Sequence, residues 1–93
     1  MGIELYAFKG GYFSCNIFNW RPLWFSVSNL CLFTDEQFTR GFFNDYQEFS
    51  YFECAHMIRC LDIYLQNNKN EPANRHLLIF CLFGKDSDGF MIG

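Results

Sequence analysis

The sequence predicts a small α+β fold: three main helices, one short helix and a minimal two-stranded antiparallel sheet formed by the N- and C-terminal segments. Three observations support this prediction. Residues 2–8 alternate as a half-buried strand does. Residues 50–65 combine a helix-capping motif with apolar residues at helical spacing. Residues 77–83 form an unbroken apolar run, Leu-Leu-Ile-Phe-Cys-Leu-Phe. We expect residues 1–93 to form one domain, long enough to build a core without disulfides or metal.

The first predicted strand covers residues 2–8. Ile3, Leu5 and Ala7 lie on one side of this strand, and the residues between them lie on the other. Gly10 and Gly11 are expected to end it, since paired glycines are typical of turns. Residues 12–17 hold no clear period, so we expect them to be irregular.

The first helix is predicted to begin at Asn19 and to end near Phe33. Asn19 is a good N-cap, and Pro22 fits a first helical turn, where its missing N–H is not needed. Apolar residues at helical spacing predict its inward face. They are Leu23, Val27, Leu30 and Cys31, with Trp20 and Trp24 beside them.

A short helix is predicted to follow, and then a loop. Thr34 and Gln37 have the spacing of a capping box, which opens the helix, and Gly41 is expected to end it. Residues 42–49 are predicted to form a loop, because Asn44-Asp45 is typical of turns and no apolar period holds there.

The clearest local signal is a second capping box, formed by Ser50 and Glu53. It opens a predicted amphipathic helix of about four to five turns. The apolar residues that follow fall within one third of the helix circumference. They are Cys54, Met57, Ile58, Leu61 and Leu65.

The last helix is predicted to start at Pro72 and to contain the apolar run 77–83, with Gly84 as its C-cap. Periodicity does not separate a buried helix from a buried strand here, and the length of the segment favours the helix. Because the run is apolar in every direction, we expect it to be buried on most sides. Residues 86–89 are predicted to form a turn, and residues 90–92 a strand that pairs with residues 3–7.

Composition excludes several classes of function. The net charge is −3, and the seven Lys and Arg residues form no basic stripe, so we expect no direct contact with nucleic acid. The longest apolar run is far shorter than the roughly 20 residues that cross a membrane. The five cysteines form no C-x-x-C motif and no signal peptide precedes them, which favours free thiols in a cytoplasmic protein.

Candidate catalytic and metal-binding residues are few. His56 and Cys60 share one side of a helix, and such a pair is the seed of a nucleophile. No neighbouring residue is seen to orient the histidine, so we predict a polar patch and no enzyme. Cys54 lies opposite His56, so one zinc ion does not bind both, although a two-ligand site completed by His76 or Cys81 stays open. The run 86–89 begins like a calcium loop but lacks the later ligands. We predict no cofactor and no metal.

Aromatic residues are the best candidates for partner binding. They make up 22% of the chain, including 13 Phe, which is more than a small core holds. The loop aromatics are either exposed anchors or a satellite core, and the tryptophans are either anchors or core residues. The predicted partner-binding residues are Phe42, Phe43, Tyr46, Phe49, Trp20 and Trp24.

Three segments resemble a group of short uncharacterised proteins from bacteria and phages. These segments are Trp20-Arg21-Pro22-Leu23-Trp24, the helix 50–65 and the ending 83–92. The pattern of that group has W-R-P-L-W early, an alanine-rich capped helix midway and S-G-G-F-x-I near the end. This chain departs from it at Asp88, where the group has glycine, and in its large aromatic residues. The resemblance implies an ordered small domain and no known activity.

We therefore predict a non-enzymatic protein-binding module. Its most specific form is a phage or mobile-element accessory protein that inhibits a host defence machine, as anti-CRISPR proteins do. An aromatic patch with an acidic rim would meet a basic surface that normally holds nucleic acid. Two alternatives stay open: a small enzyme that uses Cys60 and His56, and a structural subunit of a phage or host assembly.

Overall fold

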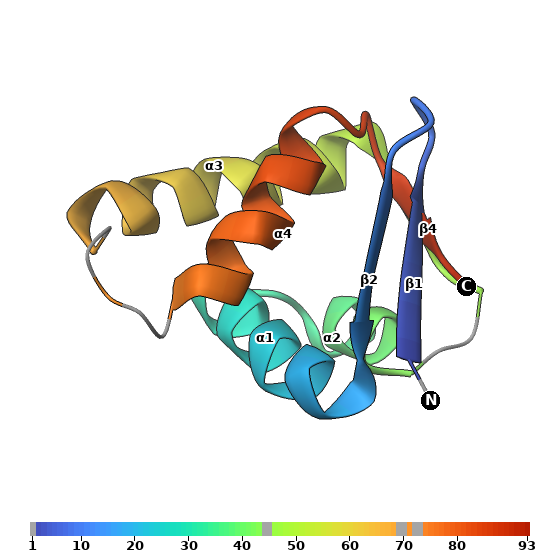
Figure 1. The fold of residues 1–93 in the computed structure, drawn as a ribbon, viewed down its shortest axis with the longest axis horizontal. Coiled ribbons are helices and arrows are strands. Elements are labelled where there is room, and N and C mark those ends of the chain that lie inside the picture. Colours follow the sequence, from blue (N-terminus) through green and yellow to red (C-terminus); the bar gives the residue numbers. More distant parts are fainter. Residues whose placement is uncertain (1, 44–45, 69–70, 72–73) are drawn as a thin grey trace.

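The computed structural model describes residues 2–43, 46–68, 71 and 74–93, and within them four helices cover one face of a four-stranded antiparallel sheet (Figure 1). The strand order is β2-β1-β4-β3. The predicted α+β class is confirmed, but the predicted two-stranded sheet is wrong. In chain order the elements are β1 (Gly2–Ala7), β2 (Tyr12–Asn16), α1 (Ile17–Leu30), α2 (Asp35–Phe42), β3 (Glu48–Phe49), α3 (Tyr51–Asn67), α4 (Arg75–Lys85) and β4 (Phe90–Ile92).

The sheet contains the predicted pairing of the two ends of the chain. β1 pairs with β4, with Leu5 opposite Ile92. The prediction missed the other two strands. β2 pairs with β1, and within it Phe13 is buried between two exposed residues. This alternation is too short to recognise without the neighbouring strand. β3 has two residues, which hold no period at all, and it pairs with β4 through Phe49 opposite Phe90.

Helix α1 begins and ends three residues earlier than predicted. The side chain of Asn16, not Asn19, caps it, because the Asn16 oxygen accepts a hydrogen bond from the Asn19 N–H at 2.8 Å. The helix ends before Leu32, which has a positive φ of 53°. Its predicted inward face is otherwise confirmed. Trp20, Leu23, Trp24, Val27 and Cys31 are buried, and Leu30 is half-buried.

Both predicted capping boxes are confirmed. In the first, the Gln37 N–H donates to Thr34 Oγ1 at 3.2 Å, and the Thr34 N–H donates to Gln37 Oε1 at 3.0 Å. In the second, Glu53 and Ser50 make the same two bonds at 3.2 and 3.1 Å. These reciprocal bonds satisfy N–H groups that a helix start leaves without partners. The predicted inward face of α3 is confirmed, with Ile58 half-buried.

The prediction that Gly41 ends α2 is wrong, because the helix continues to Phe42. Its role is close approach. A Cβ on Gly41 would lie 2.0 Å from the Trp24 ring, and the Gly41 carbonyl accepts a hydrogen bond from Trp20 Nε1 at 2.8 Å. The glycine therefore lets α2 lie directly against the two tryptophans of α1.

Residues 77–83 form a helix, α4, and not a strand, as the length of the segment favoured. The predicted start of this helix at Pro72 lies outside the described residues. Gly84 lies inside the helix and is not its C-cap; it packs against Ile58 of α3. The expectation that this run is buried on most sides is wrong. Only one side of α4 faces the core. That side carries Leu77, Phe80, Cys81 and Gly84, whereas Leu78, Ile79 and Leu82 are exposed.

The core lies between the helices and the inner face of the sheet. Its largest fully buried side chains are aromatic, and they come from α1, β3, α4 and β4. None of the described helices has the length and apolar content needed to cross a membrane. The core aromatics are Trp20, Trp24, Phe49, Phe80 and Phe90.

Candidate functional site

Three of the six predicted partner-binding residues lie in the core. Trp20 and Trp24 are fully buried and stacked on each other, with ring centroids 5.3 Å apart. Trp24 Nε1 donates to the Phe38 carbonyl at 2.9 Å, so both indoles tie α1 to α2. Phe49 is also fully buried, against Trp24 and Phe90. For the tryptophans the core alternative is confirmed, and none of the three rings is available on the surface to a partner.

The other three predicted residues reach the surface to different degrees. Phe43 and Tyr46 have exposed fractions of 56% and 77%. Phe42 is half-buried and is the last residue of α2, not the first residue of a loop. Its ring lies 5.1 Å from that of Phe43 and 5.1 Å below the guanidinium of Arg21. The segment predicted as one aromatic loop is therefore divided between surface and core.

The structure brings two further aromatic residues to Phe42 and Phe43. Phe25 of α1, half of which is exposed, contacts Phe38 of α2 at a centroid distance of 5.1 Å and Phe42 at 5.8 Å. Phe38 in turn stacks on Phe42 at 5.2 Å. We call Phe25, Phe38, Phe42 and Phe43 the aromatic surface. Phe38 and Phe42 are four residues apart, a spacing that by itself predicts two neighbouring rings on one side of a helix.

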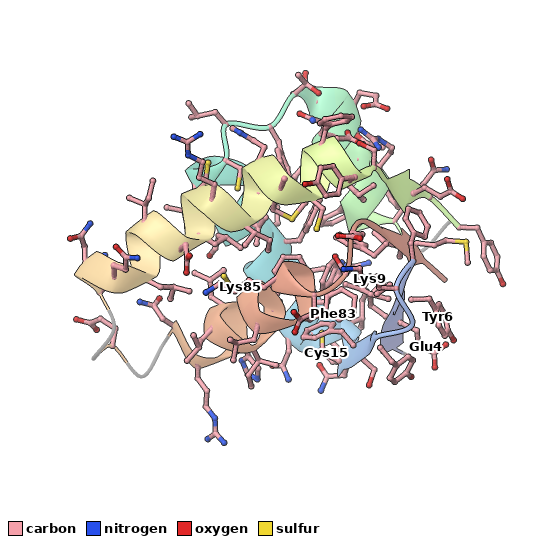
Figure 2. The ribbon with its side chains drawn as sticks, turned by 90° about the horizontal axis from the view of Figure 1, so that it is seen from above. Glu4, Tyr6, Lys9, Cys15, Phe83 and Lys85 are labelled. Carbon is pink, nitrogen blue, oxygen red and sulfur yellow. The ribbon has the colours of Figure 1, made fainter. Side chains whose placement is uncertain are left out.

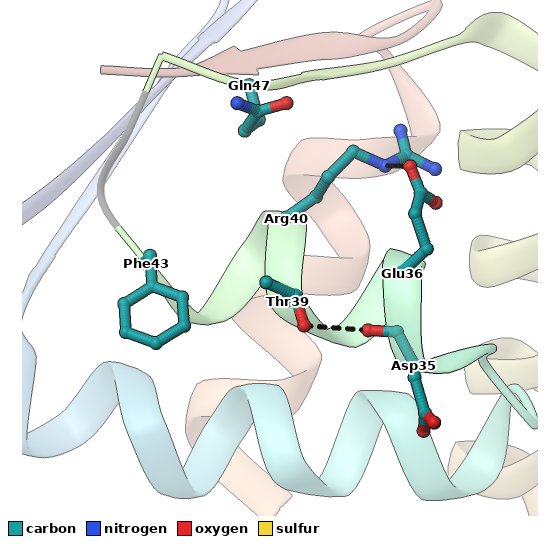
Figure 3. Close-up of a pocket in the computed structure, with 6 residues that line it drawn as sticks. All are labelled: Asp35, Glu36, Thr39, Arg40, Phe43 and Gln47. Carbon is teal, nitrogen blue, oxygen red and sulfur yellow. Dashed lines mark hydrogen bonds and ion pairs between the residues drawn. The ribbon is translucent and has the colours of Figure 1, made fainter.

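An open surface pocket of about 370 Å³ lies beside the aromatic surface (Figure 3). Figure 3 shows Phe43 at one end of α2 and Asp35 at the other, with Glu36 and Arg40 above the helix between them. Apart from Phe43, the lining side chains are polar. The lining residues are Asp35, Glu36, Thr39, Arg40, Phe43 and Gln47.

Arg40 connects this pocket to the start of α3. Its guanidinium pairs with Glu53, with Glu36 at 2.8 Å and with the Glu48 carbonyl at 2.7 Å, and it lies 4.6 Å above the Phe49 ring. Arg40 holds the pKa of Glu53 down at about 2, below its ordinary 4.5. Because two glutamates share one guanidinium, the network keeps a net negative charge. Asp35 adds a second negative charge, so the rim of the pocket is acidic.

A second group of exposed aromatics lies on the open face of the sheet. Figure 2 shows Glu4 and Tyr6 on the side of the sheet away from the helices. The hydroxyls of Tyr6 and Tyr12 donate to the two carboxylate oxygens of Glu4 at 2.8 and 3.0 Å. The two tyrosines are directly opposite in the β1–β2 register, so their contact is an ordinary cross-strand pair. Their polar groups already have partners, and this favours the aromatic surface as the candidate site.

The predicted pair of His56 and Cys60 does come together, with His56 Nε2 3.8 Å from Cys60 Sγ. The same Nε2 lies 3.1 Å from the carbonyl oxygen of Cys31. Since a carbonyl only accepts, Nε2 carries the proton in this arrangement and is not free to take one from the thiol. Burial, assisted by the neighbouring Cys60, raises the pKa of the Cys31 thiol to about 12, so Cys31 stays protonated.

The described residues contain no group of three or more His, Cys, Asp or Glu side chains that could hold a metal ion. The sequence that begins like a calcium loop forms a turn, in which Asp88 pairs with Lys9 at 3.4 Å. All five cysteines are free thiols. Burial raises the pKa of Cys15 and Cys81, which makes both thiols weak nucleophiles.

Comparisons with protein-family models, with curated proteins and with solved structures find no match to this chain.

Proposed function

We propose that this chain is a non-enzymatic protein-binding module that holds its partner on the aromatic surface beside the acidic pocket. One observation carries the proposal: Phe25 of α1, Phe38 and Phe42 of α2 and Phe43 directly after α2 pack on each other at the edge of the core, with Phe25 and Phe43 about half exposed. Exposed apolar surface of this kind is costly in water unless a partner covers it. Large, rigid aromatic side chains are the usual anchors of protein interfaces.

The charge beside the aromatic surface favours a basic partner. Glu36 and Glu53 both pair with the guanidinium of Arg40, Asp35 lines the same pocket without pairing with it, and the whole chain carries a net charge of −3. An acidic rim speeds encounter with a basic protein surface and disfavours nucleic acid itself. A surface that normally holds nucleic acid has the required charge.

The narrower prediction stays a proposal that depends on the sequence. An accessory protein of a phage or mobile element that inhibits a host defence machine, as anti-CRISPR proteins do, would need such a module and no catalytic site. We also propose a cytoplasmic location, which the five free thiols support.

The test compares two phenylalanines of equal exposure. Phe43 and Phe8 are exposed by 56% and 54%, but Phe8 lies at the β1–β2 turn, away from α2 (Figure 1). Proteins that the unmodified chain and Phe8→Ala retain from a host lysate, and that Phe43→Ala does not retain, are candidate partners. Titration with the purified partner should then show about thirtyfold weaker binding by Phe43→Ala and Phe25→Ala, with an unchanged melting temperature.

Two results would contradict the proposal. Equal binding by Phe43→Ala, Phe25→Ala and Phe8→Ala would remove the aromatic surface from the interface. A biological activity that Cys60→Ala abolishes while the aromatic variants keep it would favour the small enzyme that uses Cys60 and His56.

A further inference from the structure

The outer side of α4 is an apolar stripe with no cover. Leu78, Ile79 and Leu82 have exposed fractions of 47%, 45% and 53%. Residues three and four positions apart share one side of a helix, so the three side chains are neighbours. Figure 1 shows α4 in front of the other elements, and in Figure 2, turned by 90°, no described helix or strand lies beyond its outer side. Single exposed aliphatic residues are common, but three on two turns of one helix form a continuous surface.

A charged residue stands at each end of this stripe. Arg75 precedes Leu82 by two helical turns and Asp86 follows it by one, so both fall on the same side of the helix. Both are exposed, and neither forms an ion pair within the part of the chain that the structure describes. The neighbouring Lys85, in contrast, pairs with Asp62 of α3 at 2.9 Å.

Neither of these two charges stabilises α4 through its helix dipole. The N-terminal end of a helix is the positive end of its dipole, so Arg75 stands at the unfavourable end, and Asp86 stands at the negative end. The first turn of α4 contains no acidic residue to offset Arg75. This arrangement costs the helix a little free energy, and among the described residues neither charge has an ion pair, so both are available to a contact outside the chain.

We propose that α4 is a dimerisation helix, on which a second copy of this chain packs its own α4 in antiparallel orientation about a two-fold axis. In this register Arg75 lies opposite the partner's Asp86, and Ile79 lies opposite the partner's Leu82. The two-fold axis repeats each contact, so one self-complementary patch supplies two ion pairs around an apolar centre. A parallel pairing would instead place each charge beside its own copy, which is repulsive.

The dimer is expected to be weak. A helix of 11 residues is about 16 Å long, so the contact falls at the small end of specific interfaces. We expect a dissociation constant on the order of micromolar, rising with salt as the two exposed ion pairs are screened. The proposal goes beyond the protein-binding function and does not depend on it, since no residue of the aromatic surface belongs to α4.

The experiment is sedimentation equilibrium of the full chain from about 1 to about 500 µM, a range that spans the expected dissociation constant. The weight-average mass should rise from 11.1 kDa toward twice that value. Ile79→Glu should stay a monomer throughout. Ile63→Glu on the outer side of α3 is the matched control, because Ile63 is also exposed, at 57%, and this variant should dimerise normally. Circular dichroism melts confirm that both variants are folded.

The ion pairs test the orientation. Arg75→Glu and Asp86→Arg should each weaken the dimer about three- to thirtyfold, because either change places two repulsive pairs in the interface. The double variant restores both pairs with reversed sign, so its dissociation constant should return to within about threefold of the original. A monomeric mass at every concentration, or a dimer that survives Ile79→Glu, would overturn the proposal. A double variant as weak as the single ones would overturn the antiparallel register.

Discussion

Helices α3 and α4 pack against each other, yet they present opposite relations between sequence and burial. In α3 the apolar residues at helical spacing are the buried ones, and polar residues occupy much of the other side. In α4 the run 77–83 is wholly apolar, but its outer half faces solvent. Leu61 of α3 is fully buried, whereas Leu82 of α4 is 53% exposed.

The difference shows what an apolar pattern specifies. The sequence of a helix with one apolar and one polar side predicts which side faces the core, because burying the polar side would be costly. A run without polar positions, such as residues 77–83, indicates only that some side of its helix is buried, and packing against neighbouring elements decides which side. The two helix starts differ as well, since Ser50 caps α3 with a side-chain bond and Asn74 makes no such bond for α4.

The largest expected effect comes from truncating one leucine in each helix. Leu61→Ala should lower the free energy of unfolding by about 2–5 kcal/mol, because it leaves a cavity in the core. Leu82→Ala should lower it by less than about 0.5 kcal/mol, because half of the side chain is already in water. Urea titrations at about 1 µM protein, where α4 pairing contributes little, measure both values. Equal losses would erase the contrast between the two helices.

The start of α3 should respond to pH. Arg40 lowers the pKa of Glu53 to about 2 from 4.5, so the charged carboxylate favours the folded chain. The resulting stability is present above about pH 4.5 and is lost as the pH falls toward 2, with a loss of about 3 kcal/mol at most. Urea titrations at pH 6 and pH 3 should show this component in the unmodified chain but not in Glu53→Gln.

Glu36→Gln is the control for this prediction. Glu36 pairs with the same guanidinium, but its side chain is 70% exposed, so its loss should cost no more than about 1 kcal/mol. A pH dependence that is equal in the Gln variants of both positions would show that Glu53 has no special role at the start of α3.

The contact between the two helices is tested at Gly84. A Cβ there would lie 2.1 Å from Ile58 Cδ1 and 2.7 Å from Cγ1. Gly84→Ala should therefore cost about 1–3 kcal/mol, as the two helices separate or Ile58 changes its rotamer. Thermal melts measure the loss, and adding Ile58→Val, which removes Cδ1, should recover part of it. An Ala variant as stable as the original would mean that α3 and α4 lie further apart.

Of the substitutions expected to destabilise the fold measurably, the smallest effect is expected at the cap of α3. Ser50→Ala removes the hydroxyl that accepts from the Glu53 N–H at 3.2 Å and should cost about 1 kcal/mol. Ser50→Thr keeps the hydroxyl and should stay within about 0.5 kcal/mol of the original. A chemical denaturation series of the two variants checks the difference, and an Ala variant matching the Thr variant would show that this cap contributes nothing.

Much of the fold could be predicted because its signals are local. The reciprocal bonds of Thr34 with Gln37 and of Ser50 with Glu53 join residues three positions apart, so a four-residue motif predicts each helix start. The alternation of β1 is equally local. β2 and β3 were missed because five and two residues hold too little of a pattern, and pairing with β1 and β4 stabilises them.

The candidate site was predicted only in part, because only some of its residues are indicated by local sequence signals. Phe43 and Tyr46 lie on the surface, as an aromatic segment without a buried face suggests. Phe49, six residues after Phe43, is instead buried against Trp24, because β3 places it on the inner side of the sheet. Phe25 joins Phe38 only when α1 and α2 pack, so no sequence window contains the aromatic surface.

By itself, the sequence determined the α+β class, both capping boxes, the pairing of residues 90–92 with residues 3–7 and the buried side of α3. These features follow from hydrogen bonds between near neighbours or from a period of apolar residues. Only the tertiary structure decided that the sheet has four strands, that Trp20, Trp24 and Phe49 are core, and that Leu78, Ile79 and Leu82 are not. The physical reason is that hydrophobicity drives burial without direction, and a small domain has too little interior for all its apolar side chains.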